Sequence, residues 1–174
     1  TKLSDEEARL EILKVINDNG KPVNKPEDLK IFPWVPKAIK ALNEAKYKVF
    51  IVTNQGGIEL GYFNEMALKE IHGELLSQLN KEGAHIDDIS YCPHFKTQCN
   101  CRKPMPGMLI NLAKKHNIDL KASYMVGDRD VDILCGKNAG CKTIKIGKPF
   151  DKADYCAKNL LEAVKFIIND SGGY

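Results

Sequence analysis

The sequence has little that would place the protein in a membrane or on nucleic acid. No stretch of its 174 residues reaches the roughly 18 consecutive apolar residues of a membrane span. Basic and acidic residues nearly balance, at 26 and 23, and no run of Lys and Arg dominates, so no nucleic-acid partner is expected. Residues 1–7 are polar and acidic, unlike a secretory signal. These absences leave a globular protein with no membrane partner.

The sequence also lacks the spread of cysteines that marks a disulfide framework. Three of its six cysteines lie between residues 92 and 101, beside His94. Such clustering is typical of a metal site in a reducing compartment, so we expect a cytoplasmic protein. The isolated Cys135, Cys141 and Cys156 are interpreted as small hydrophobic residues.

The length fits one domain better than two, and we expect a single domain over residues 1–174. Segments with helical periodicity alternate with short runs rich in β-branched residues. The expected strands cover residues 48–53, 86–91, 123–128 and 142–146, and the expected helices cover residues 35–46, 64–82, 107–116, 130–139 and 160–168. This alternation predicts an α/β fold with a mainly parallel sheet and helices on both faces. Functional groups are then expected at the carboxyl ends of the strands.

A metal loop is the strongest local signal. Cys92, His94, Cys99 and Cys101 supply three thiolates and one imidazole within ten residues. Four such ligands in two close pairs suit tetrahedral Zn²⁺, and because no position is left for water, the zinc would be structural. It would clip a loop with little apolar content of its own. The alternatives are unrelated core cysteines, or a redox pair at Cys99 and Cys101.

Two polar groups lie near expected strand ends and suit a phosphate. Thr53 and Asn54 end a buried strand and are followed by residues 55–57, Gln-Gly-Gly. A hydroxyl and backbone N–H groups presented there can hold phosphate oxygens. Arg102 and Lys103 follow the zinc loop and form a cationic clamp. The alternatives are an ordinary strand end and a solvated surface pair.

A third polar group follows the strand expected at residues 123–128. Asp128, Asp130 and Asp132 place three carboxylates within five residues, which favours a hard cation such as Mg²⁺. Asp128 is the best ligand candidate because it is closest to the strand. Asp130 or Asp132 would alternatively cap the following helix.

Taken in order, these motifs resemble the D-glycero-D-manno-heptose 1,7-bisphosphate phosphatase family, which belongs to the haloacid-dehalogenase superfamily and is similar to histidinol-phosphate phosphatases. The resemblance is carried by residues 51–55, 61–63, 91–94, 99–108 and 125–129 together with Asp132, and it spans about Val15 to Ile146. The zinc loop followed by Arg-Lys-Pro is quite specific to this group. The resemblance implies a Rossmann-like haloacid-dehalogenase fold without a large cap domain.

The resemblance also implies an activity, that of a magnesium-dependent phosphoric monoester hydrolase acting on a small sugar phosphate, expected as a monomer. Thr53 would hold the transferring phosphoryl group, Lys103 would neutralise transition-state charge, and Asp128 would bind Mg²⁺. The residues that it places at the substrate are Asn54, Gln55, Arg102 and Arg129, and those at Zn²⁺ are Cys92, His94, Cys99 and Cys101. The alternative activities are those of a histidinol-phosphate phosphatase or a polynucleotide 3′-phosphatase.

The chain departs from the superfamily at its first motif, a strand ending in Asp-x-Asp-Gly. There the first Asp attacks phosphorus and the second transfers the proton. Alignment without gaps places Glu11 in the nucleophile position and Leu13 in the acid position, whereas residues 17–20, Asn-Asp-Asn-Gly, have Asn in both. Residues 4–10 resemble a capped helix start rather than a buried strand.

Three interpretations of this departure are open. The protein is a zinc-containing pseudoenzyme that binds a phosphorylated ligand or a partner, it uses a different carboxylate, or its N-terminal segment is not that of the natural gene product.

Overall fold

The computed structural model describes residues 15–17 and 23–171. The helix start expected at residues 4–10 lies outside these residues. So do both positions of the first alignment, Glu11 and Leu13, and residues 18–20 of the second.

The described elements follow the predicted alternation. The helices are α1 (Trp34–Glu44), α2 (Glu65–Lys81), α3 (Gly107–His116), α4 (Asp130–Ala139) and α5 (Leu160–Ser171), with 3-10 turns η1 (Pro26–Asp28) and η2 (Leu120–Ala122). The strands are β1 (Phe50–Asn54), β2 (Asp88–Cys92), β3 (Tyr124–Gly127), β4 (Lys142–Ile146) and β5 (Tyr155–Ala157). The bounds of α3, α4 and β4 are those predicted. Strand β5 was missed because three residues are too few to show a period.

Local chemistry explains where two of these helices begin or end. Asn64 precedes α2, and its side-chain oxygen accepts the N–H of Ala67 at 2.9 Å, which satisfies a backbone donor of the first turn. Gly140 ends α4 with a φ of 87°, a left-handed conformation that glycine adopts without a steric penalty. The polar side chain and the glycine therefore fix the ends that the sequence indicated.

The pairs among the five described strands are parallel, which confirms the predicted sheet type. Strand β1 pairs with β2, and β3, β4 and β5 form a second group in that order. Asn54 lies opposite Cys92 in the β1–β2 register, so the end of β1 lies beside the start of the zinc loop. In the β3–β4 register Gly127 lies opposite Lys145. The polar motifs therefore follow the carboxyl ends of their strands.

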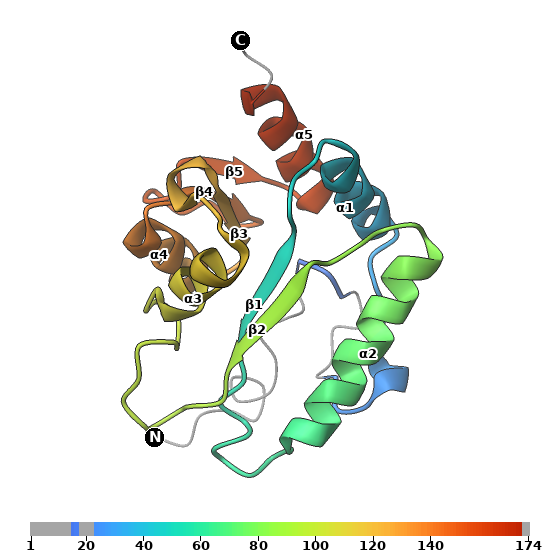
Figure 1. The fold of residues 1–174 in the computed structure, drawn as a ribbon, viewed down its shortest axis with the longest axis vertical. Coiled ribbons are helices and arrows are strands. Elements are labelled where there is room, and N and C mark those ends of the chain that lie inside the picture. The colour runs from blue at the N-terminus through green and yellow to red at the C-terminus, as the bar shows by residue number, and fades with distance from the viewer. Residues whose placement is uncertain (1–14, 18–22, 172–174) are drawn as a thin grey trace.

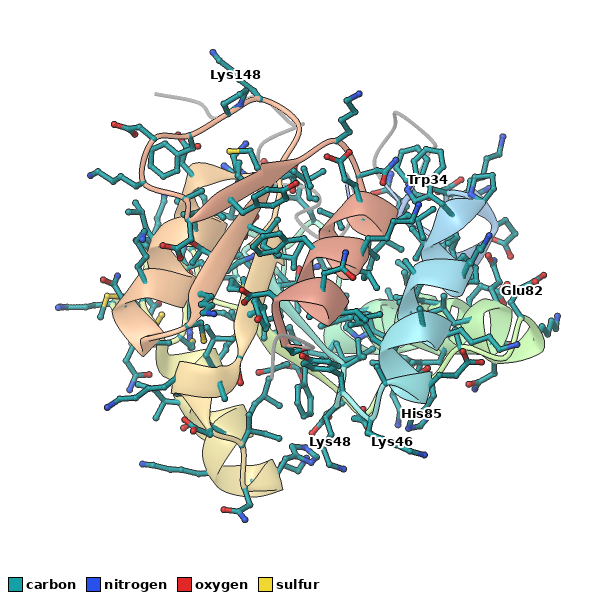
Figure 2. All side chains as sticks on the ribbon, turned by 90° about the horizontal axis from the view of Figure 1, so that it is seen from above. Trp34, Lys46, Lys48, Glu82, His85 and Lys148 are labelled. Atoms are coloured by element: carbon teal, nitrogen blue, oxygen red, sulfur yellow. The ribbon has the colours of Figure 1, made fainter. Side chains whose placement is uncertain are left out.

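Helices cover both sides of the strands, as the sequence predicted. In Figure 1, α3 and α4 lie on one side and α1 and α5 on the other. Figure 2 shows α1 and α5 next to each other. Side chains from α1, α2, α5, β1 and β4 form one buried core, which includes Val35, Leu75, Leu79, Ile144 and Val164.

A cavity of about 500 Å³ lies between β1 and β3. Its wall is mainly apolar and includes Ile51 of β1 and Met125 of β3. Its lining also includes several charged residues, among them Lys103, Asp128 and Asp132. The cavity therefore joins the hydrophobic core to the charged groups expected at the functional site.

Candidate active site and metal centre

The four residues predicted to bind zinc come together. One potential ligand atom from each of Cys92, His94, Cys99 and Cys101 lies within 4.8 Å of all the others. The Cys92 and Cys99 sulfurs are 3.7 Å apart, and His94 Nδ1 lies 3.5 Å from Cys92 Sγ and 3.4 Å from Cys101 Sγ. Tetrahedral zinc separates two sulfurs by about 3.8 Å and a sulfur from a nitrogen by about 3.5 Å. The donor set therefore fits a tetrahedral ion, and the interpretation as unrelated core cysteines is wrong.

One sulfur–sulfur distance in this cluster is shorter than tetrahedral zinc coordination requires. The sulfurs of Cys92 and Cys101 are 2.8 Å apart, closer than two zinc ligands but well beyond the roughly 2.05 Å of a disulfide. Burial raises the pKa of the Cys92 thiol. Burial also acts to raise the pKa of Cys99, but hydrogen bonds from the backbone N–H groups of Arg102 and Cys101 outweigh it and bring that pKa down to about 6. The backbone thus favours a thiolate at Cys99.

The loop that carries these ligands also holds Arg102. The backbone N–H of Arg102 points to Cys99 Sγ at 3.4 Å. Its guanidinium donates to the backbone oxygen of His94 at 3.0 Å and lies over the Phe95 ring, 5.0 Å from the ring centroid. Arg102 is therefore attached to the zinc loop by its backbone and its side chain, and is not a freely solvated surface cation.

Asn54 holds the backbone of Lys103. The N–H of Lys103 donates to Asn54 Oδ1 at 2.9 Å, and Asn54 Nδ2 donates to the Lys103 carbonyl oxygen at 3.3 Å. Both residues are buried. The end of β1 and the segment after the zinc loop, 49 residues apart in the chain, are thus joined by one side-chain amide.

The ammonium group of Lys103 lies inside the protein beside a carboxylate. Its Nζ is 2.5 Å from Asp132 Oδ1 and 3.4 Å from the carbonyl oxygen of Val52. The other carboxylate oxygen of Asp132 accepts the N–H of Arg129 at 3.0 Å. Asp132 therefore both satisfies a backbone donor at the start of α4 and pairs with the predicted catalytic lysine.

The remaining predicted residues lie around this pair. Thr53 and Gln55 are buried, and Gln55 Nε2 donates to Thr53 Oγ1 at 3.0 Å. Asp128 follows β3, is partly buried, and lines the same cavity as Lys103. Arg129 is exposed at the start of α4, so the structure leaves its side chain outside the buried group.

Two contacts in this arrangement, one made by Asp132 and one by Glu59, were not predicted from the sequence. Asp132 was considered as a magnesium ligand or a helix cap, and its position three residues after Arg129 was a capping signal, but nothing local indicated its contact with Lys103. Glu59, in the loop after β1, accepts hydrogen bonds from residues 95–97 of the zinc loop. A single glutamate in a loop carries no pattern that would have revealed this contact.

In the part of the chain that the structure describes, no helix has the length and apolar composition needed to cross a membrane.

Comparisons with known proteins agree with the resemblance found in the sequence. Residues 100–170 match a protein-family model described as "HAD-hyrolase-like". The chain is 40% identical over 134 residues to the D-glycero-beta-D-manno-heptose-1,7-bisphosphate 7-phosphatase of Rhodopseudomonas palustris. The aligned region covers 72% of this chain and 74% of that protein. The chain is 35% identical over 161 residues to the enzyme of the same name from Haemophilus ducreyi, covering 83% of this chain and 88% of that one.

A solved structure is similar over nearly the whole chain. It is the crystal structure of the D,D-heptose 1,7-bisphosphate phosphatase from B. bronchiseptica complexed with magnesium and phosphate, with a TM-score of 0.81 and 27% identity over 90% of this chain and 93% of that one. Relatives named as phosphatases do not favour the pseudoenzyme interpretation. The chain belongs to the heptose 1,7-bisphosphate phosphatase family of the haloacid-dehalogenase superfamily and has the α/β fold of its phosphoric monoester hydrolases.

Proposed function

We propose that this protein removes a phosphate from D-glycero-D-manno-heptose 1,7-bisphosphate in a magnesium-dependent reaction. The observation that carries the proposal is the buried ammonium of Lys103, which lies 2.5 Å from Asp132 and lines a cavity together with Asp128. A cation held in place before substrate arrives can neutralise phosphoryl oxygens without reorganisation. The 7-phosphatase names of the relatives support the choice of substrate and of the phosphate removed.

Asp128 would hold the magnesium ion. It supplies a partly buried carboxylate after a strand, and Mg²⁺ is commonly bound by one or two carboxylates together with waters and substrate phosphates. When bound, the ion would supply Lewis-acid neutralisation of phosphoryl oxygens. Haloacid-dehalogenase phosphatases generally use magnesium, and the B. bronchiseptica structure is a complex with it.

The end of β1 would hold the phosphoryl group. The Thr53 hydroxyl would donate a hydrogen bond to a phosphoryl oxygen. Gln55 would orient this hydroxyl, because its Nε2 donates to Thr53 Oγ1 at 3.0 Å. Asn54 would position Lys103 through the two backbone contacts that it makes with that residue. Arg102 and the exposed Arg129 would bind the more distant, anionic part of the substrate.

Zinc would serve as a structural ion in this proposal. Cys92, His94, Cys99 and Cys101 would bind it, and the contact of the Arg102 N–H with Cys99 links the ion to the segment that carries Lys103. A site that requires thiolates is maintained in a reducing compartment, so we propose a cytoplasmic enzyme. We also propose a single domain that acts as a monomer.

The nucleophile is assigned to Glu11, which lies outside the described residues. The resemblance aligns Glu11 with the attacking carboxylate of the family. Val15 and Ile16, four and five residues later, line the same cavity as Lys103 and Asp128. Four residues span at most about 13 Å, so the chain length permits a carboxylate at residue 11 to reach that cavity. The carboxylate would attack phosphorus and displace the sugar oxygen, which would take a proton from water because Leu13 cannot supply one. A second water would then hydrolyse the acyl phosphate, which releases inorganic phosphate and restores the carboxylate.

The proposal is tested by phosphate release from the heptose bisphosphate with and without magnesium. The wild-type protein should release phosphate only with magnesium, and Lys103→Ala and Thr53→Ala should each reduce kcat by at least 10²-fold. Lys121→Ala, which changes an exposed residue of η2, is the matched control and should retain activity. Equal release by wild type and Lys103→Ala would refute the assignment.

A further inference from the structure

Glu59 connects two loops that border the candidate active site. It follows β1 and is exposed. One carboxylate oxygen accepts the N–H of Lys96 at 2.8 Å and the other accepts that of Thr97 at 3.1 Å. The N–H of Phe95 and the hydroxyl of Thr97 also donate to this carboxylate. The Glu59 carboxylate therefore accepts hydrogen bonds from three consecutive residues.

The backbone reinforces this connection. The N–H of Glu59 donates to the carbonyl oxygen of Pro93 at 3.3 Å. Contacts of Glu59 thus extend from Pro93 to Thr97, the part of the zinc loop that surrounds His94 and leads toward Cys99. The metal ligands would secure the two ends of this loop, whereas Glu59 secures the residues between them.

Phe95, whose N–H Glu59 accepts, is also in contact with Arg102. The Arg102 guanidinium lies 5.0 Å from the centroid of the Phe95 ring and donates to the His94 carbonyl oxygen at 3.0 Å. Gly56 leaves little room on the other side: a Cβ there would lie 2.9 Å from the Phe95 ring and 3.0 Å from the Arg102 guanidinium. The direction of Arg102 therefore depends on the position of Phe95.

We propose that Glu59 is a positioning residue that fixes the orientation of Arg102 by holding the backbone of Phe95. It thereby sets the affinity of the site for the second anionic end of the substrate. The inference rests on the proposed function in assigning Arg102 to substrate recognition. Glu59 itself would touch neither the substrate nor a metal ion.

The test uses Glu59→Gln, which keeps the size of the side chain but presents an NH₂ group to backbone N–H donors. Binding is measured by isothermal titration calorimetry of the magnesium-free protein, which should not hydrolyse the ligands, with D-glycero-D-manno-heptose 1,7-bisphosphate and with the corresponding 7-phosphate, which lacks the second anionic end. The affinity for the bisphosphate should fall about tenfold, the scale of one lost charged hydrogen bond. The affinity for the 7-phosphate should change less than twofold, and zinc content should not change. Glu82→Gln, on an exposed residue after α2 (Figure 2), is the matched control.

A double-mutant cycle separates positioning from a general structural effect. In an Arg102→Ala background, Glu59→Gln should weaken bisphosphate binding no further, because its effect passes through Arg102. An unchanged bisphosphate affinity in Glu59→Gln, an equal loss for both ligands, or a full additional loss in the Arg102→Ala background would overturn the inference alone. No binding of the bisphosphate by wild-type protein would overturn the proposed function and this inference together.

Discussion

The ammonium group of Lys103 lies 2.5 Å from the carboxylate of Asp132, and their side chains are only 3% and 6% exposed. The two residues are 29 positions apart in the chain. Removing water from two charges is unfavourable, and their mutual attraction offsets this only while both are present. The contribution of this ion pair to stability is therefore tested by comparing a single substitution with a double substitution.

Lys103→Met should reduce the free energy of unfolding by about 3–5 kcal/mol, because it leaves the Asp132 carboxylate buried without its cation. The double variant Lys103→Met, Asp132→Leu should recover most of that loss, since both charges are gone. Urea denaturation at pH 7 measures the stabilities, and phosphate release measures the activity. Both variants should be inactive. A double variant as unstable as the single one would show that the pair is not the source of the loss.

Gly127→Ala should disturb the same pair without changing a charge. A Cβ at residue 127 would lie 2.3 Å from Asp132 Cβ, so Asp132 has to move away from Lys103. We expect a loss of kcat of at least tenfold, comparable to other small displacements of catalytic groups, measured by phosphate release. The matched control is Gly73→Ala in α2, where nothing lies within 4 Å of the added Cβ. That change should stabilise the helix by up to about 1 kcal/mol and leave activity intact.

The zinc assignment predicts one metal ion per chain and a loss on mutation. Cys99→Ser removes the thiolate that the Arg102 N–H contacts, so the variant should bind zinc far more weakly and unfold at a lower temperature than wild type. Metal analysis and thermal unfolding measure these two effects. Cys141→Ser is the control, because Cys141 lies outside the cluster and its substitution should leave the zinc content at one. Full zinc occupancy in Cys99→Ser would contradict the assignment.

The sequence predicted features whose determinants lie close together in the chain. The C-terminal end of α4 could be predicted because Gly140 follows its last residue. The zinc ligands could be predicted because all four occur within residues 92–101. The parallel sheet followed from the alternation of helices and strands.

The contacts that the sequence did not reveal connect distant segments. Asp132 meets Lys103 across 29 residues, and Glu59 meets Lys96 and Thr97 across 37 and 38 residues. Such pairs depend on tertiary packing, and an isolated charged residue gives no signal of which partner it will meet.

Asp88 predicts a pH-dependent contribution to stability. Its carboxylate accepts from Lys115 Nζ at 2.8 Å and lies 2.7 Å from His116 Nε2. The hydrogen bond from Lys115, followed by that from His116, lowers the pKa of Asp88 to about 2. Because this pKa is below the value of about 3.9 in an unfolded chain, the stabilisation is present above pH 4 and is lost as the pH falls through 2.

Asp88→Asn should therefore lower the free energy of unfolding by about 1 kcal/mol at pH 7, since the pair is partly exposed. Urea denaturation of wild type and variant between pH 7 and pH 2.5 measures the difference, which should shrink below pH 4. Asp151→Asn, at an exposed position, is the control and should show no such trend. A constant difference across the range would contradict the assigned pKa.

The assignment of Glu11 as nucleophile makes the strongest prediction, a gain of activity. Glutamate is longer than aspartate and would misplace the attacking oxygen by about 1 Å, which can reduce the rate on the order of 10²-fold. Leu13, in the position of the general acid, cannot donate a proton. The double variant Glu11→Asp, Leu13→Asp places both carboxylates of the superfamily motif in the chain, and kcat should rise at least 10²-fold.

Phosphate release with magnesium measures this gain, and two variants make it specific. Glu11→Gln, Leu13→Asp keeps the acid but removes the nucleophile, so its activity should be lower than that of the wild type. Adding Lys103→Ala to the gain-of-activity variant should abolish the gain, because the attacking carboxylate and the Lys103 ammonium act on the same phosphoryl group. If the Glu11→Gln variant released phosphate as fast as the Glu11→Asp variant, another carboxylate would be the nucleophile.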